Sequence, residues 1–407
     1  MKSIDDLIAK YCPYGVEYKE LWQLTIWDKK FNEVERDKQP TTISYHYFLA
    51  DELEQMAVSG GTIKLLTTSP SNIFTSEEIA DDKISEGEIV SIPWGGYPHV
   101  QYYKGRFLTA DNRIATSRDI EVLDNKFLYY IMANRTRTIN SFYRGSGIKH
   151  PSMARVLNLP IPLPHIEIQR EIVRILDDFT GLIDELEAEL AARRKQYEQY
   201  RDRVLESDIG TYKKVTVSDV CKNICSGGTP TAGNGKFYNG NIPWLRTQEV
   251  DWRDIVKTSL TITEEGLSNS SAKWIPANCV IVAMYGATAG KVAINRIPLT
   301  TNQACCNLEI DENVAEYKFV FYWLSYRYAQ LKKLGQGTQS NINAAIVKKF
   351  PINLPSLQEQ KRIVETLDKF DALCNDETSG LAAEIAARKK QYEYYRDKLL
   401  TFKRKAS

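Results

Sequence analysis

Several residues of the chain could take part in catalysis, but none of them has partners at the spacing that catalysis requires. The segment 286–292 is similar to a phosphate-binding loop, yet it is one residue too short and has no Ser or Thr after Lys291. The four histidines stand apart from cysteines and carboxylates at metal-ligand spacing. Cys221 and Cys225 lie four residues apart on an expected helix, and no second pair follows. We therefore expect a glycine-rich turn at 286–292, no catalytic residues and no metal site.

Other polar residues have the chemistry of nucleic-acid recognition, and many of them lie in or near glycine-containing segments of two regions. Arg and Lys bind phosphates and guanine edges, and Gln or Asn can bond adenine in a bidentate manner. Glycine lets such a segment approach a DNA backbone closely. Each segment alone is equally compatible with an ordinary surface turn. The candidate DNA contacts are Lys64, Thr68, Tyr97, His99, Arg113, Arg144, Ser146, Lys149, His150, Thr229, Arg246, Gln248, Lys291, Gln303, Gln336, Gln339, Ser340 and Asn341.

The two regions end in the same way, which links the two groups of candidates. Each has a Gly-x-Gly, at 145–147 and at 335–337, followed by polar residues. A proline-containing stretch comes next, at 159–164 and at 350–355. The same placement in both regions supports a shared role for the two loops.

The net charge of +1 is unevenly distributed along the chain. Residues 1–90 carry 9 basic and 17 acidic side chains, whereas 91–160 carry 10 and 4. Residues 161–208 carry 7 and 12, residues 209–355 carry 16 and 10, and residues 356–407 carry 11 and 9. Two basic blocks with an acidic block between them suggest two surfaces that face a polyanion. Ordinary variation of surface charge is the alternative.

The composition is that of a globular protein in a reducing compartment. Of the 407 residues, 43% are apolar and 26% are charged, which are ordinary values for soluble domains. The longest apolar run, 279–285, is far too short for a membrane span, and the N-terminus lacks the apolar core of a signal peptide. Seven scattered cysteines favour free thiols over a disulfide framework. We expect a cytoplasmic protein.

An internal duplication organises the chain. Residues 191–205 return 195 positions later as 386–400, with 11 of 15 positions identical. Upstream, 163–179 aligns with 354–370 at an offset of 191, so the second copy holds four extra residues. The chain therefore consists of two similar halves, each a variable block followed by a repeated segment.

Both repeated segments are predicted to be long helices. In the first, a heptad seam of steps of four and three residues runs from Ile172 to Val204. The four extra residues of the second segment predict a stutter, and a looped-out kink near Gly380 is the alternative. Two seams of similar length are expected to pack on each other, and docking of each helix on its own block is the alternative. About 40 residues would make a rod of roughly 60 Å.

The variable blocks are predicted to be mixed α/β domains. Strand-like runs at 61–66, 88–92 and 280–284 lie between turn residues. Each block also has an expected helix near its end, at 126–141 and at 317–334. The expected divisions are 1–160 and 209–355 for the domains, and 161–208 and 356–407 for the helices.

Three sets of motifs together point to a known family. The twin segments 193–202 and 388–397 read Arg-(Arg/Lys)-Lys-Gln-Tyr-Glu-x-Tyr-Arg-Asp, and each helix starts after Leu-Pro. The second block adds Gly-Gly-Thr-Pro at 227–230 and Asn-Ile-Pro-Trp-Leu-Arg at 241–246. With these motifs the chain resembles, over essentially its whole length, the specificity subunit of type I restriction–modification systems. The first block lacks the latter pair and matches the family only at its edges, at 16–19 and 145–149.

The resemblance implies an α+β fold in which two target recognition domains are separated by two long antiparallel helices with pseudo-twofold symmetry. It further implies sequence-specific binding of double-stranded DNA, each domain reading one half of a bipartite asymmetric target. Adenine methylation or restriction would be performed by partner subunits that use S-adenosylmethionine, ATP and magnesium, and this chain would bind none of these cofactors. Two methyltransferase subunits would dock on the helices, and restriction or translocase subunits would join through the complex.

Four tyrosines of the repeated segments are candidate partner contacts: Tyr197, Tyr200, Tyr392 and Tyr395. Such amphipathic side chains suit a half-exposed seam, although they could equally stitch the two helices together. Two other functions compete with the resemblance. A stand-alone methyltransferase or nuclease would act as the purified chain alone, and a structural coiled-coil adaptor would show no salt-dependent DNA binding.

Overall fold

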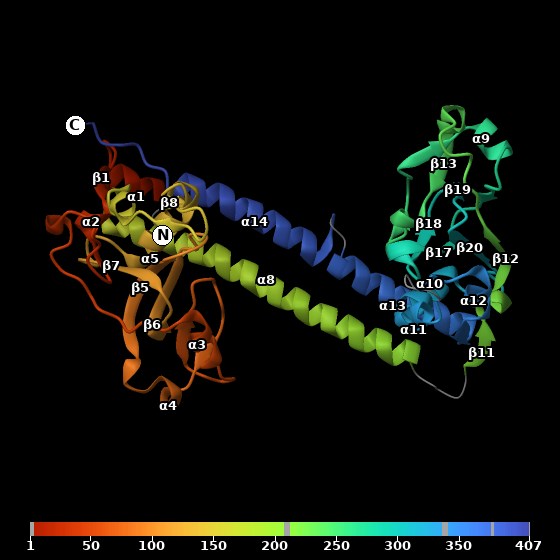
Figure 1. The fold of residues 1–407 in the computed structure, drawn as a ribbon, viewed down its shortest axis with the longest axis horizontal. Coiled ribbons are helices and arrows are strands. Elements are labelled where there is room, and N and C mark those ends of the chain that lie inside the picture. The colour runs from red at the N-terminus through yellow and green to blue at the C-terminus, as the bar shows by residue number, and fades with distance from the viewer. Residues whose placement is uncertain (1–3, 207–211, 336–340, 376–377, 407) are drawn as a thin grey trace. The chain divides into compact units, whose positions relative to one another are not determined.

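The computed structural model describes residues 4–206, 212–335, 341–375 and 378–406. Its chain divides into two compact units (Figure 1), of which unit 1 is Met1–Leu186 with Ile385–Ser407 and unit 2 is Glu187–Glu384. The long helix α8 (Ile166–Glu206) contributes its first half to unit 1 and its second half to unit 2. Within the described ranges, no helix has the length and apolar character needed to cross a membrane.

A six-stranded mixed sheet forms the centre of unit 1, with the strand order β2-β7-β5-β6-β3-β4. Phe127 and Ile131 of helix α5 share a buried core with Val90 and Ile92 of the sheet, so α5 covers one sheet face. The strands are β1 (Glu17–Glu20), β2 (Thr25–Trp27), β3 (Ile63–Leu66), β4 (Phe74–Thr75), β5 (Ser85–Pro93), β6 (Gln101–Thr109), β7 (Asn112–Ser117), β8 (Tyr143–Arg144), β9 (His150–Pro151) and β10 (Pro160–Leu163). The helices besides α8 and α14 are α1 (Ile4–Tyr11), α2 (Leu21–Leu24), α3 (Ala50–Gln55), α4 (Glu77–Ala80), α5 (Asn125–Asn134), α6 (Thr136–Asn140) and α7 (Met153–Leu157), with short 3-10 turns η1 (Arg36–Lys38) and η2 (Asp81–Lys83).

Unit 2 has the same strand pairing split over two sheets, β12-β20-β17-β18-β14 and β15-β13-β19-β16. In unit 1 the single strand β6 pairs with β5 on one side and in parallel with β3 on the other. In unit 2 these pairings are divided between β18, which joins β17, and β19, which joins β13 in parallel. Pro298 lies between β18 and β19, and a proline cannot donate a hydrogen bond to a continuous ladder.

The remaining bounds in unit 2 follow chain order. The strands are β11 (Lys213–Thr216), β12 (Cys221–Ser226), β13 (Tyr238–Leu245), β14 (Asp254–Ile255), β15 (Leu260–Ile262), β16 (Trp274–Ile275), β17 (Val280–Ala283), β18 (Val292–Asn295), β19 (Leu299–Thr301), β20 (Cys305–Ile310) and β21 (Pro351–Leu354). The helices are α9 (Glu264–Ser268), α10 (Tyr317–Tyr326), α11 (Tyr328–Lys333), α12 (Ala344–Lys349) and α13 (Leu357–Asn375), with 3-10 turns η3 (Val217–Val220), η4 (Gly235–Phe237), η5 (Thr247–Glu249) and η6 (Gly286–Thr288).

The sequence predicted one helix near the end of each variable block, and the structure confirms both. Each is divided by one arginine into two helices, α5 and α6 at Arg135 and α10 and α11 at Arg327. The three predicted strand runs correspond to β3, β5 and β17. The expected helix at Cys221–Cys225 is wrong: these residues form β12, because they pair with β20 across the sheet.

The heptad seam of α8 is buried within both units. In unit 1, Ile172 and Leu176 of α8 lie in one core with Leu400, which follows helix α14 (Gly380–Leu399), and Phe179 stacks on Tyr395 with ring centroids 5.5 Å apart. In unit 2, Tyr197 and Tyr200 contact Phe370 of α13 at ring-centroid distances of 6.0 and 6.1 Å. In each unit the residue numbers of the two contacting helices run in opposite directions, so each pair is antiparallel. The helices pack on each other and also on the block of their own unit, which combines both expectations.

The second repeated segment is two helices rather than one continuous helix with a stutter. Helix α13 ends at Asn375 and α14 begins at Gly380, which has a φ of +78°. A Cβ at Gly380 would lie 2.6 Å from the carbonyl oxygen of Ala372. This close approach explains the glycine, and it supports the kink over the stutter.

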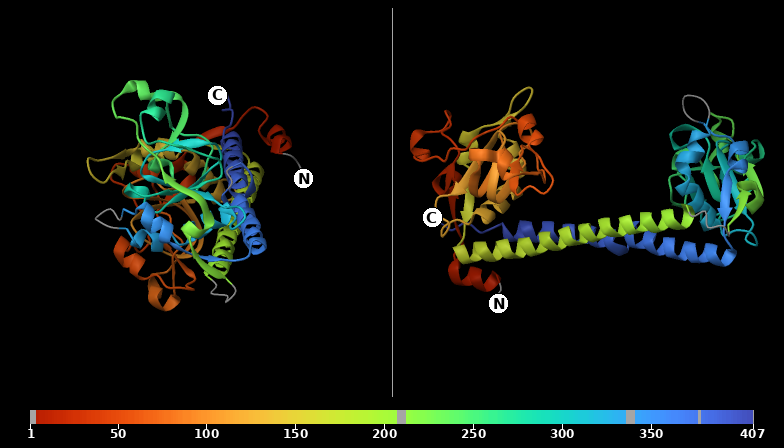
Figure 2. Two further views of the ribbon diagram at one scale, coloured as in Figure 1. Left: turned by 90° about the vertical axis from the view of Figure 1, so that its right-hand side faces the viewer. Right: turned by 90° about the horizontal axis from the view of Figure 1, so that it is seen from below.

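The last described residues of the chain lie against its first strand in unit 1. The Val16 N–H donates to the Lys403 carbonyl oxygen and the Lys405 N–H donates to that of Val16, both at 2.9 Å. The Tyr18 hydroxyl donates to the Phe402 carbonyl oxygen at 3.0 Å. Figure 2 shows this C-terminal segment leaving α14 toward the beginning of the chain.

Candidate nucleic-acid interface

Two repeated glutamines attach each block to its long helix. Gln169 is fully buried, its Oε1 accepts from the Asp124 N–H at 2.9 Å, and its Nε2 donates to the carbonyl oxygens of Val122 and Pro164 at 2.8 Å each. The counterpart in unit 2, Gln360, is also fully buried, with Oε1 accepting from the Glu316 N–H at 2.8 Å and Nε2 donating to the Pro355 carbonyl oxygen at 2.9 Å. The identity of these two residues in the repeat therefore has a structural reason.

Two repeated aspartates make the same attachment with charge. Asp177 accepts from the Tyr130 hydroxyl at 2.6 Å and from the Lys126 ammonium at 2.8 Å. In unit 2, Asp368 accepts from the Tyr322 hydroxyl at 2.7 Å and also binds the Lys318 ammonium. Burial and the neighbouring carboxylate raise the pKa of both tyrosines, so each phenol remains a donor.

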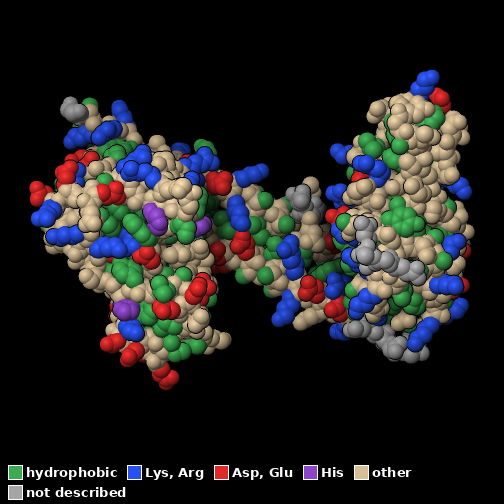
Figure 3. Space-filling model, viewed as in Figure 1, with side chains coloured by type: hydrophobic (Ala, Val, Ile, Leu, Met, Phe, Trp, Pro, Cys, Tyr) green, Lys and Arg blue, Asp and Glu red, His purple; other side chains and the backbone are tan. Residues whose placement is uncertain are grey.

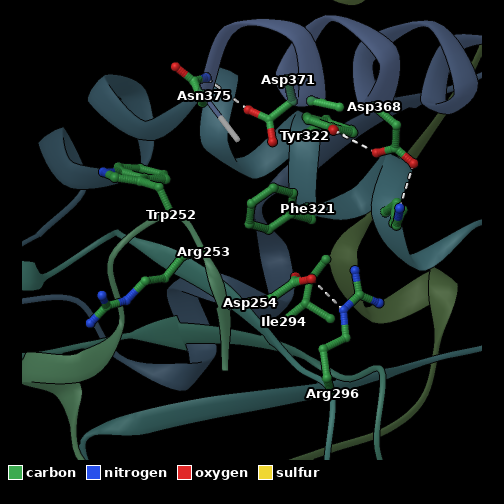
Figure 4. Close-up of a pocket in the computed structure, with 12 residues that line it drawn as sticks. Trp252, Arg253, Asp254, Ile294, Arg296, Phe321, Tyr322, Asp368, Asp371 and Asn375 are labelled. Atoms are coloured by element: carbon green, nitrogen blue, oxygen red, sulfur yellow. Dashed lines mark hydrogen bonds and ion pairs between the residues drawn. The ribbon is translucent and has the colours of Figure 1, made fainter. Parts of the chain in front are cut away.

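A cleft of about 640 Å³ lies beside this attachment in unit 2 (Figure 4). It is lined by residues of α10 and α13 and of the edge around β14 and β18. Several of its charged groups are paired within the unit, such as Arg296 with Asp254 at 2.6 Å, next to the Tyr322–Asp368 bond. The cleft thus separates the sheet edge from the helices while these pairs hold its walls.

In unit 1 two predicted loops lie side by side. The His150 ring Nδ1 is 2.8 Å from the Trp94 carbonyl oxygen, and the Gly96 N–H donates to the Lys149 carbonyl oxygen at 3.0 Å. A Cβ at Gly95 would lie 2.9 Å from Ile148, so glycine permits this close approach. Trp94–His99 and Arg144–His150, which are far apart in sequence, form one surface.

The equivalent loops of unit 2 also lie together, at the turn that is similar to a phosphate-binding loop. The Gly286 N–H donates to Asn341 Oδ1 at 3.2 Å, and the Ile342 N–H donates to the Met284 carbonyl oxygen at 2.9 Å. The Thr288 hydroxyl donates to the Thr247 carbonyl oxygen at 2.8 Å, which places the turn beside Arg246 and Gln248. The glycine-rich segment is therefore the turn that the sequence predicted, centred on η6.

The Gly-Gly-Thr-Pro motif joins the same surface through tight packing. A Cβ at Gly227 would lie 1.9 Å from the Thr301 carbonyl oxygen, and the Gly228 N–H donates to that oxygen at 2.9 Å. The next residue, Thr229, is exposed and bonds through its hydroxyl to the exposed Gln303 side chain. The motif thus presents Thr229 on a backbone that only glycine can form.

Most of the sequence-predicted contacts lie at accessible positions. The exposed ones are Tyr97, Arg144, Ser146, Lys149, His150, Thr229, Gln248 and Gln303, and the half-buried ones are Thr68, His99, Arg246 and Asn341. Three further candidates, Gln336, Gln339 and Ser340, lie outside the described residues.

Three candidates are engaged within the protein and are corrected here. The Arg113 side chain is 1% exposed and pairs with Asp28 and Asp111, so direct contact with DNA does not fit its position. The Lys64 ammonium donates to the Ser71 carbonyl oxygen and lies over the Phe74 ring. Lys291 pairs with Asp251 at 2.6 Å. Residue type alone predicts a free cation, whereas the pairing partners are set by tertiary structure.

Sequence reasoning missed residues that border both surfaces. Lys29 is exposed, with its ammonium 5.9 Å from the centre of the Trp94 ring. Tyr285, 43% exposed, and Thr288 flank the turn of unit 2. The glycine spacing at 286–290 was the available signal for the latter two, but the position of Lys29 depends on a long-range contact.

The four tyrosines on the repeated helices mostly face inward. Burial raises the pKa of Tyr197 to about 12, and Tyr392 packs against the core of unit 1. Tyr395 is 36% exposed while its ring stacks on Phe179. The stitching of helices within each unit therefore accounts for Tyr197 and Tyr200, and Tyr395 remains accessible.

Surface charge does not gather into a single patch on the face seen in Figure 3. Lys and Arg side chains are interspersed with acidic ones over the visible face of unit 1 and of unit 2. The basic excess of the two blocks is thus distributed, and local loop chemistry distinguishes the two surfaces better than net charge.

Comparison with known proteins resolves the family. The family model described as the type I restriction modification DNA specificity domain matches residues 60–193 and again 209–387. The chain belongs to this specificity-subunit family. The specificity subunit is 39% identical over 305 residues to the type I restriction enzyme EcoR124I/EcoR124II specificity subunit of Escherichia coli, a match covering 71% of this chain and 74% of the relative.

Two further comparisons agree with this membership. The specificity subunit is 30% identical over 339 residues to a putative type I restriction enzyme specificity subunit of Haemophilus influenzae, covering 78% of this chain and 83% of the relative. Its fold is similar to the crystal structure of a type I restriction–modification S subunit from M. genitalium, with a TM-score of 0.61, 16% identity and coverage of 95% and 96%. The predicted α+β fold and the family resemblance are confirmed.

Proposed function

We propose that this specificity subunit selects the DNA target of a type I restriction–modification complex, with each unit reading one half of a bipartite, asymmetric sequence. The observation that carries the proposal is the matched pair of loops: 94–99 with 144–150 in unit 1, and 284–290 with 341–342 in unit 2. The supporting scaffold is duplicated while the loops differ in sequence. Two different half-sites are therefore expected.

The chemistry itself is assigned to other subunits. The polar groups of the loops suit phosphate and base contacts, and the anchoring residues around Asp177 and Asp368 are committed to packing. Adenine methylation or restriction would be performed by partner subunits with S-adenosylmethionine, ATP and magnesium. The subunit would work in the cytoplasm, where its DNA and partners are.

Sequencing of methylated adenines in cells that express the complex tests the proposal. Residues 209–355 would be exchanged for the corresponding segment of a relative with another target, because β21 and β11 pair within this segment. We expect a new second half-site and an unchanged first half-site. A simultaneous change of both halves would refute independent reading, and methylation without this chain would refute its role.

The boundary for the first domain needs a small adjustment for such an exchange. The division at 160 falls within β10, whose residues 160–163 pair with β1. An exchange of 1–164 keeps this pair intact, and we propose it for the reciprocal experiment. Here the first half-site should change and the second should remain.

Partner docking is proposed on the helices through exposed positions such as Tyr394 and Tyr395, which are 63% and 36% exposed. We expect two methyltransferase subunits per specificity subunit, and native mass spectrometry measures this ratio. A one-to-one assembly would contradict it. If the assembled complex lacks salt-dependent DNA binding, the coiled-coil adaptor function would replace target recognition.

A further inference from the structure

We infer that buried Arg113 is a positioning residue for the DNA-reading loops of unit 1, and that it sets the base selectivity of the first half-site without touching DNA. The inference rests on the proposed function and deepens it. It concerns a residue whose type suggests direct DNA contact but whose position excludes it.

Arg113 is held at the centre of a buried polar cluster. Its Nη1 donates to Asp28 Oδ2 at 2.9 Å and to the Asn112 carbonyl oxygen at 3.0 Å, while Nη2 binds Asp111. Asp28 is itself held by the Tyr47 hydroxyl at 2.7 Å and by the Ile114 N–H at 3.0 Å. A guanidinium is a rigid planar fork, so several fixed acceptors define its orientation.

The cluster reaches the loops through Trp94. The Arg113 guanidinium carbon lies 4.6 Å from the centre of the Trp94 ring, which is the range of a cation–π contact. The Trp94 N–H donates to the Asp111 carbonyl oxygen at 2.9 Å, so Arg113 contacts both the side chain of Trp94 and the residue that anchors its backbone. The carbonyl oxygen of Trp94 in turn holds His150 at 2.8 Å. One cation therefore supports both loops.

Unit 2 builds the same loop pair without a buried ion pair. Met284 occupies the place of Trp94, since its N–H donates to the Ala304 carbonyl oxygen at 2.8 Å and its carbonyl oxygen accepts from Ile342. The strand position equivalent to Arg113 is Cys306, in an apolar core with Met284. A folded sheet of this type thus does not need the cation for stability. Its presence in unit 1 is a feature of that half alone.

The cluster also differs from an ordinary structural ion pair in where it points. Lys126–Asp177, at 2.8 Å in the same unit, joins α5 to α8 and touches neither loop. Both pairs contribute to packing, but only Arg113 has loop residues as neighbours. Lys126 is therefore a matched control for loss of an ion pair.

The experiment compares Arg113→Lys, Arg113→Met and Lys126→Met in the full complex. Duplexes would carry the methylated motif of the unmutated complex, or single-base substitutions in one half-site at a time. Unmutated complexes discriminate such substitutions by roughly 10- to 100-fold per base pair. We expect Arg113→Lys to lose about tenfold or more of this discrimination in the first half-site only, with the methylated motif relaxed there. Lys126→Met should keep full discrimination.

Folding and function are separated by the same set. Lys preserves charge but not the planar fork, so Arg113→Lys is the variant expected to fold, and its thermal unfolding would be measured alongside. Undiminished discrimination by folded Arg113→Lys, or an equal loss in Lys126→Met, would overturn the inference. If the unmutated complex shows no discrimination at all, the proposed function fails instead. If Arg113→Lys loses binding to all duplexes equally, Arg113 supports the fold and not selectivity, which also overturns the inference.

Discussion

Replacement of the two repeated glutamines by leucine should destabilise the two units separately and unequally. Gln169 makes three buried hydrogen bonds and Gln360 makes two. A buried hydrogen bond contributes about 1 kcal/mol net, and leucine leaves the backbone partners unsatisfied. We therefore expect Gln169→Leu to cost about 3 kcal/mol in unit 1 and Gln360→Leu about 2 kcal/mol in unit 2.

Hydrogen exchange followed by mass spectrometry can assign the loss to a unit, because α5 reports on unit 1 and α10 on unit 2. At 1.4 kcal/mol per factor of ten, α5 amides should exchange about 100-fold faster in Gln169→Leu and α10 amides about 30-fold faster in Gln360→Leu. Gln196 is exposed, and Gln196→Leu serves as the control, with an expected change within about 0.5 kcal/mol. Equal acceleration of both helices in either variant would refute separate anchoring, and no acceleration would refute the role of the glutamines.

Three other outcomes are expected. Lys149→Ala should weaken binding by about 1–3 kcal/mol on the specific duplex alone if it reads a base, and equally on all duplexes if it binds phosphate; unchanged binding in gel shifts would remove this loop from the interface. Gly227→Ala should destabilise unit 2 by about 1–3 kcal/mol or prevent its folding, since its Cβ would meet Thr301; an unchanged urea midpoint would contradict this packing. Burial raises the pKa of Cys279 and Cys306 to about 12, so their reactive thiolates are scarce below that pH, and alkylation at pH 8 should require unfolding; rapid labelling of the folded chain would disprove their burial.

The sequence predicted the elements of the fold where local pattern and repetition act together. The seam from Ile172 to Val204 predicted α8, and Leu-Pro predicted its beginning, because apolar spacing and proline act locally. The strand β12 was missed because its assignment depends on β20, more than 80 residues away. Position 298 shows the same limit, since one proline divides a sheet whose pairing only the folded structure defines.

The candidate site was predictable by residue type but not by pairing. The loop residues Lys149 and Thr229 are exposed as expected. Arg113, by contrast, is buried because Asp28, 85 positions earlier, lies beside it. Charge attracts partners as readily as it attracts DNA, and the choice between them is made by tertiary contacts.

The attachment of residues 402–405 to the first strand has a consequence for synthesis on the ribosome. Unit 2 consists of one uninterrupted stretch, Glu187–Glu384, and can complete its contacts as soon as that stretch has emerged. Unit 1 begins earlier but needs Ile385 and the residues after it, including Lys403 and Lys405 beside Val16. The half that is translated first is thus completed last. Its partial form, without α14, must stay soluble while more than 200 further residues are made.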